Sequence, residues 1–177
     1  PLSITRYAEQ ALKALLRYDI KALVVACNTA SAVALDSLQS SYPALQITGV
    51  VAPGAEAAVK VTRSGKIGVI ATESTVNNQA YQKAILSLLP DANVKSAACS
   101  LFVALAEEGW HEGELVEAIV KRSLSGLFDH YCSGADYPDT LVLGCTHFPA
   151  LKSAIARVVG EKVSLVDSAV ITASVLS

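Results

Sequence analysis

Two cysteines in this sequence share one local setting, and that setting could carry out proton chemistry. Cys27 follows a run of alanine and valine and precedes Asn28–Thr29. Cys145 follows a run of leucine and valine that ends at Gly144, and it precedes Thr146–His147. Each run is typical of a buried parallel strand, so each cysteine is expected where a strand ends and a helix begins.

Ligands of open α/β sheets bind at such strand-to-helix turns. We therefore expect the two turns to close around one small molecule and to offer it a sulfur from each side. This arrangement suits the removal of a proton from one face of a carbon and the return of a proton to the other face. A helix N-terminus presents free N–H groups and a positive dipole end, so it should hold a carboxylate and favour thiolate over thiol.

Five further side chains each have two interpretations. His147 follows the second cysteine by two residues, where it could cap the next helix or relay the cysteine's proton. Glu107 and Glu108 follow an apolar run and are typical of a solvated helix end, although one of them could enter a cleft. Thr72 and Thr75 follow a third strand, where they could cap a helix or meet a bound carboxylate.

The remaining cysteines, Cys99 and Cys132, lack such neighbours and are interpreted as structural. The four cysteines have no zinc-finger spacing and form no dense disulfide framework, so we expect reduced thiols. His, Asp and Glu residues show no metal-ligand spacing, and the chain has no glycine-rich dinucleotide or phosphate fingerprint. Neither a metal nor a cofactor is expected.

Charge and hydropathy exclude several kinds of partner. The chain has 177 residues and a formal net charge of −2, with no basic block. Nucleic acid is not expected to bind, because phosphate neutralisation needs clustered Lys and Arg. The longest stretch without a charged residue, between Asp36 and Glu56, is broken by serine, proline and glycine, so we predict no membrane span. No export signal is readable, and we expect a cytoplasmic protein.

Strand-like and helical segments alternate along the chain, which predicts parallel sheets with helices on both faces. An opening helix is expected to bury one apolar face formed by Tyr7, Ala11, Leu12, Leu15 and Leu16. Ser74 or Thr75 is expected to cap the helix that carries Tyr81 and Leu88. Residues 129–138 are expected to form a surface loop. The strands are predicted at about 22–26, 46–50, 67–71, 94–98, 141–144 and 163–166.

Two stretches identify a family that the chain resembles. VVACNTASAVAL (24–35) and LVLGCTHFPAL (141–151) resemble glutamate racemase, the cofactor-independent enzyme that supplies D-glutamate for peptidoglycan. GVVAPGAEAAV, KIGVIATESTV, CSLFVALAEEGW and SLVDSA extend the likeness over essentially the whole chain. Related aspartate racemases usually carry an acidic residue where this chain has His147, which favours glutamate as the substrate.

The resemblance implies an α/β fold of two pseudo-symmetric, flavodoxin-like parallel-sheet domains with the site between them. Residues 1–50 and 167–177 would form the first domain, incomplete here, and 51–166 the second. Cys27 would act on D-glutamate and Cys145 on L-glutamate, each as base in one direction and acid in the other. Glu107 would lie near the second cysteine, which replaces its interpretation as a solvated helix end, and His147 would assist that cysteine. The implied substrate contacts are Asn28, Thr29, Thr72, Thr75, Thr146 and His147.

The chain departs from the family at several positions. Ser100 and Ala104 stand where many relatives have prolines. An Asp-Ser-Gly-x-Gly-Gly loop, whose aspartate partners the first cysteine, and a Pro-Tyr-Gly segment would precede Pro1, so residues 1–177 alone are expected to have negligible racemase activity. Two alternatives stay open: a cysteine hydrolase or transferase that uses Cys145 with His147, and a truncated chain without activity. The oligomeric state is also open, with a homodimer as one arrangement.

Overall fold

The computed structural model describes residues 2–128 and 137–176. Its strands are β1 (Ala22–Val25), β2 (Gln46–Gly49), β3 (Lys66–Ala71), β4 (Asn93–Ala98), β5 (Thr140–Gly144) and β6 (Ser164–Asp167). Its helices are α1 (Leu2–Leu15), α2 (Asn28–Ser41), α3 (Val51–Val61), α4 (Glu73–Asn78), α5 (Ala80–Leu88), α6 (Leu101–Glu107), α7 (Glu114–Leu124), α8 (Lys152–Val159) and α9 (Ser168–Leu176), with short 3-10 turns η1 (Leu16–Tyr18) and η2 (Phe148–Leu151).

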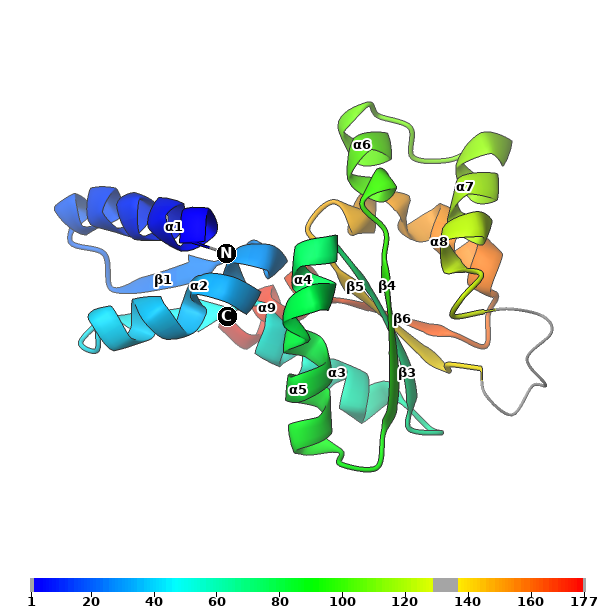
Figure 1. The fold of residues 1–177 in the computed structure, drawn as a ribbon, viewed down its shortest axis with the longest axis horizontal. Helices are drawn as coiled ribbons and strands as arrows, with labels where there is room; N and C mark the ends of the chain where they lie inside the picture. The colour runs from blue at the N-terminus through cyan, green and yellow to red at the C-terminus, as the bar shows by residue number, and fades with distance from the viewer. Residues whose placement is uncertain (1, 129–136, 177) are drawn as a thin grey trace.

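The strands form two parallel sheets, one with the order β1-β2 and one with the order β4-β3-β5-β6. The predicted α/β fold and its strands are confirmed, and each strand boundary falls within two residues of its expected place. The expectation that the strand before Cys27 is buried is wrong, because β1 has a single neighbouring strand and its residues are exposed or half-buried. Figure 1 shows the small sheet with α1 and α2 on one side of the molecule and the four-stranded sheet on the other. The division into two domains at the predicted residues stays a prediction.

The four-stranded sheet lies between two apolar layers. Leu141 and Leu143 of β5 face a cluster that includes residues of α6, α7 and α8, whereas Val142 faces a cluster built from α3 and α5. Figure 1 shows these helices on opposite sides of the sheet. β5 is buried along its whole length because it has a neighbouring strand on each side and a helical layer on each face.

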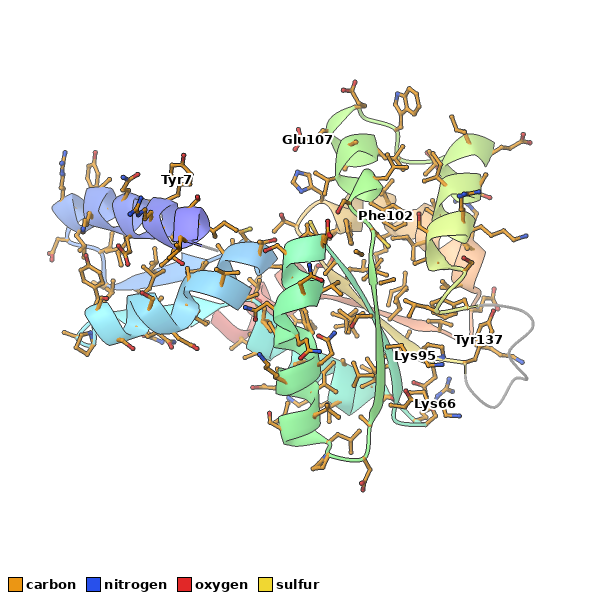
Figure 2. The ribbon with its side chains drawn as sticks, viewed as in Figure 1. Tyr7, Lys66, Lys95, Phe102, Glu107 and Tyr137 are labelled. Carbon is orange, nitrogen blue, oxygen red and sulfur yellow. The ribbon has the colours of Figure 1, made fainter. Side chains whose placement is uncertain are left out.

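The small sheet has a much thinner core. Leu12 of α1 packs with residues of α2 and β2, and Ala8 lies against the same cluster. The predicted apolar face of α1 is confirmed for Leu12, which is buried, and wrong for Tyr7, Leu15 and Leu16, which are exposed; Tyr7 is 72% exposed and points away from the sheet in Figure 2. Two strands and one neighbouring helix offer only enough surface to cover a narrow stripe of α1.

The predicted cap of the helix that carries Tyr81 and Leu88 is also wrong, because Gln79 is the N-cap residue of that helix, α5. Ser74 and Thr75 lie inside α4, and Thr72 occupies the N-cap position of α4 without a side-chain capping bond. The hydroxyl of Thr72 instead contacts two other threonines, as described below. Of the predicted loop at 129–138, residues 129–136 lie outside the described part of the chain, and so does Cys132.

Asp139 fastens the turn after α3 to the start of β5. Its carboxylate accepts hydrogen bonds from the Thr62 hydroxyl at 2.7 Å and from the backbone N–H groups of Arg63 at 2.8 Å and Ser64 at 2.7 Å. The Thr140 hydroxyl donates a fourth at 2.9 Å. Burial works to raise the pKa of Asp139, but these four donors outweigh it and hold the pKa well below its usual range.

We therefore predict that Asp139→Asn destabilises the fold at neutral pH by about 1–2 kcal/mol, a value reduced for partial solvent exposure. The folded-state pKa lies below the unfolded value of about 3.9, so the ionised carboxylate favours the folded state. Its contribution is complete above about pH 5 and disappears as the pH falls through the folded pKa. Urea unfolding of both proteins from pH 7 to pH 3 should show the difference shrink, whereas Asp91→Asn, in an exposed turn, should change little.

Candidate active site

Cys27 and Cys145 occupy matching positions in the two sheets. Cys27 follows β1 and is the N-cap residue of α2, where its carbonyl accepts the Ser31 N–H at 2.8 Å and its thiol is exposed. Cys145 follows β5 directly, and its carbonyl accepts the Phe148 N–H at 3.1 Å as η2 begins. Unlike Cys27, Cys145 is buried.

The two thiols lie close enough for their charges to interact. Burial is the largest effect on Cys145 and raises the pKa of its thiol. The backbone N–H of His147 opposes this rise, the charge of Cys27 adds to it, and hydrogen bonds from Thr146 again oppose it. The net pKa of Cys145 is raised, so the expectation that the helix start favours thiolate over thiol is wrong for this cysteine, because burial outweighs the N–H donors.

A histidine and a carboxylate extend from Cys145 toward solvent. The sulfur of Cys145 lies 3.8 Å from Nδ1 of His147, and Nε2 of His147 lies 2.5 Å from Oε1 of Glu107. Glu107 ends α6, and Figure 2 shows it at the tip of that helix; its side chain is 65% exposed. With the hydrogen on Nε2 donated to Glu107, Nδ1 is free to accept the proton of the thiol. Glu108 is exposed at the surface, as expected.

Three threonine hydroxyls meet between the sheets. Thr29, at the start of α2, lies 2.8 Å from the hydroxyl of Thr72 and 3.1 Å from that of Thr75. Thr72 and Thr75, which follow β3, are 3.1 Å apart. Each hydroxyl can donate or accept, so the cluster can turn donors toward an incoming carboxylate. Contact of these threonines with substrate stays a prediction.

Asn28 has buried partners that sequence reasoning missed. Its Oδ1 accepts the Tyr81 hydroxyl at 2.6 Å, and its Nδ2 donates to the Ser168 hydroxyl at 3.4 Å. Ser168 also donates to the carbonyl of Leu143 at 3.4 Å. Because the protein's own groups occupy the amide, a direct bond from Asn28 to substrate stays a prediction. Tyr81 and Ser168 lie far along the chain from Asn28, although Ser168 stands in the family-like SLVDSA stretch.

The other residues of interest are accounted for more simply. Thr146 is exposed beside Cys145, and its contact with substrate also stays a prediction. Cys99 is buried at the end of β4, and burial raises the pKa of its thiol to about 12, which fits a structural role.

Within residues 2–128 and 137–176, no three His, Cys, Asp or Glu side chains are grouped to hold a metal ion. No helix in the same ranges is long and apolar enough to cross a membrane.

The two parallel sheets and their paired cysteine turns agree with the family to which the sequence belongs. The sequence pattern of the Asp/Glu/Hydantoin racemase family matches residues 3–176, and the chain belongs to this family.

Within the family, the chain is similar to glutamate racemases. It is 49% identical to glutamate racemase of Geobacter metallireducens over 177 residues, which are all of this chain and 63% of the relative. A crystal structure of a glutamate racemase isoform from Bacillus anthracis superposes with a TM-score of 0.91 at 38% identity, covering 98% of this chain and 63% of the other. The glutamate racemase of Francisella tularensis, solved in complex with D-glutamate, superposes with a TM-score of 0.88 at 34% identity. The match covers 99% of this chain and 62% of the other. The chain thus spans about three-fifths of the relatives that it matches.

The burial of the three described cysteines predicts an order of alkylation. Cys27 should react with iodoacetamide first because its thiol is exposed, Cys145 should react more slowly and gain rate as the pH rises because its pKa is raised, and Cys99 should react last. Peptide mass spectrometry after timed labelling at pH 7 to pH 9.5 measures the order. Equal labelling of Cys145 and Cys27 at pH 7 contradicts the raised pKa.

Proposed function

We propose that the protein interconverts L- and D-glutamate with Cys27 and Cys145 as its two bases. The observation that carries this proposal is the placement of two thiols at equivalent strand ends, near enough for their charges to interact. A substrate α-carbon held between them would meet one sulfur on each face. Membership of the racemase family and the similarity to glutamate racemases support the assignment.

The chemical difficulty is the weak acidity of the α-hydrogen of an amino acid. One thiolate would remove this proton while the thiol opposite donates its own to the other face, so one proton enters the product as another leaves. When D-glutamate binds, Cys27 would be the base and Cys145 the acid. The raised pKa of Cys145 suits this direction, because it keeps the proton on the sulfur until the carbanion needs it.

The opposite direction needs Cys145 as thiolate, and His147 with Glu107 would supply it. Nδ1 of His147 lies 3.8 Å from the sulfur and can take the thiol proton, while Glu107, 2.5 Å from Nε2, stabilises the imidazolium that forms. Transfer of the proton from Cys145 to His147 leaves a thiolate and an imidazolium, so charge is conserved. After turnover Cys145 holds the substrate proton and Cys27 is a thiolate, so the imidazolium would release its proton to solvent and Cys27 would take one up from solvent.

The substrate would be held by hydroxyl and N–H donors. Thr29, Thr72 and Thr75 form a cluster beside the start of α2, whose N-terminus favours an anion. The relative from Francisella tularensis binds D-glutamate, which supports glutamate as the substrate here. The reaction would use no cofactor, and D-glutamate made in the cytoplasm would supply peptidoglycan synthesis.

The same geometry favours a second candidate, a cysteine hydrolase or transferase. Cys145, His147 and Glu107 form a thiol–imidazole–carboxylate chain like the one that activates a nucleophilic cysteine. Such an enzyme would pass through a covalent acyl intermediate on Cys145 and would not need Cys27. The two candidates therefore differ in their requirement for the first cysteine.

A test of this requirement uses protein expressed from the complete reading frame, in heavy water. Two-base racemisation should place a solvent deuteron on the product enantiomer while recovered substrate gains little label. Cys27→Ser and Cys145→Ser should each lower kcat by at least about 10³-fold, because serine is a far weaker acid than a thiol. Chiral chromatography with mass detection follows both. Normal turnover by Cys27→Ser would favour the hydrolase.

The histidine–carboxylate pair should act mainly in one direction. Glu107→Gln should lower kcat for L-glutamate by about 10- to 100-fold and kcat for D-glutamate by less, because only the L-direction needs Cys145 deprotonated. Since the enantiomers have equal free energy, kcat/KM must remain equal in the two directions, so KM for L-glutamate should fall relative to KM for D-glutamate. Polarimetry from each enantiomer measures these constants. Glu108→Gln, one residue away and exposed, is the control, and an equal loss of kcat in both directions contradicts the assignment.

A further inference from the structure

Tyr81 stands at the point where the two cysteine turns come together. It belongs to α5 and is 1% exposed. Its ring fits a slot between two glycines: a Cβ built on Gly144 would lie 2.9 Å from the ring, and one built on Gly54 would lie 3.1 Å from it. A side chain at Gly144 would collide with the ring and one at Gly54 would crowd it, so the backbone next to Cys145 packs directly on Tyr81.

The hydroxyl of the same ring reaches the other turn. It donates to Oδ1 of Asn28, the residue after Cys27, at 2.6 Å. Burial raises the pKa of Tyr81 above its ordinary value, so the hydroxyl stays protonated and serves as a permanent donor rather than as a carrier of protons. A buried hydroxyl is costly without a partner, so the bond to Asn28 also fixes where that residue lies.

One rigid side chain therefore touches both turns. Its ring sets the place of Gly144 and so of Cys145, and its hydroxyl sets the place of Asn28 and so of Cys27. The other connection between the turns runs from Asn28 through Ser168 to the carbonyl of Leu143, and its bonds of 3.4 Å are long. Tyr81 makes the shorter link.

We propose that Tyr81 is a positioning residue that sets the spacing of the two thiols across the substrate. This inference rests on the proposed two-cysteine racemisation. Proton transfer is sensitive to the distance between the reacting atoms, whereas hydroxyl and N–H donors hold a carboxylate over a wider range of positions. Loss of the Tyr81 hydroxyl should thus slow the chemical step more than it weakens substrate binding.

The test compares two tyrosine-to-phenylalanine variants of protein expressed from the complete reading frame. Tyr81→Phe keeps the ring and removes the bond to Asn28. Tyr137→Phe is the matched control, because its hydroxyl donates one hydrogen bond, to the carbonyl of Phe128 at 2.9 Å. Figure 2 shows Tyr137 at the opposite end of the four-stranded sheet from Glu107.

Tyr81→Phe should lower kcat by about 10-fold or more in both directions, with KM for glutamate changed less than twofold. Tyr137→Phe should retain wild-type kcat. Both should lose a few degrees of Tm, as expected for one lost hydrogen bond. Wild-type kcat in Tyr81→Phe, or a loss confined to KM, overturns the positioning role.

A second variant covers the case in which Tyr81→Phe does not fold. Ser168→Ala removes the longer connection and leaves the ring in its slot, and it should lower kcat less than Tyr81→Phe, by about twofold to fivefold; a larger loss of kcat assigns the spacing to Ser168 and overturns the inference. Racemisation by the wild-type protein distinguishes failure of the proposed function from failure of the positioning role alone. If it fails to racemise glutamate, the proposed function fails; if it racemises and Tyr81→Phe matches Tyr137→Phe, only the positioning role fails.

Discussion

The parallel pairing of β5 with β3 and β6 decides where the candidate site lies. In this register Ala71 stands beside Gly144 and Leu143 beside Asp167, so the residues that follow the three strands emerge at one edge of the sheet. Those residues are Thr72, Cys145 and Ser168. An antiparallel neighbour would carry its next residue to the other edge. The chemistry of the site is therefore a consequence of strand direction.

Burial and hydrogen bonding have opposite effects on the pKa of Cys145. Removal of the thiol from water disfavours the thiolate, and the nearby Cys27 disfavours it further. The backbone N–H of His147 and the hydrogen bonds from Thr146 act in the other direction. A group balanced in this way can be both acid and base, which is what a reversible proton transfer between mirror-image substrates demands. The exposed Glu107 places the outer end of the Cys145–His147–Glu107 chain in solvent.

Strands and cysteine turns could be predicted because their signals are local. A run of apolar residues followed by a cysteine and polar neighbours occupies a few consecutive positions, and parallel sheets order such runs in a regular way. The partners of Asn28 could not be predicted, because Tyr81 and Ser168 have no sequence signal that joins them to it. The apolar face of α1 was predicted too wide for a related reason: periodicity identifies an apolar face but not how much of it a thin neighbouring layer can cover.

The bond between Asn28 and Ser168 joins residues 140 positions apart. A ribosome makes the first turn long before the last helix, so a growing chain holds Cys27 and its neighbours without the groups that lock them in place. Contacts of such long range also close a large loop, which slows folding. Until Ser168 has left the ribosome and docked, the turn that carries Cys27 lacks one of the bonds that hold Asn28, so its final geometry forms only late in synthesis.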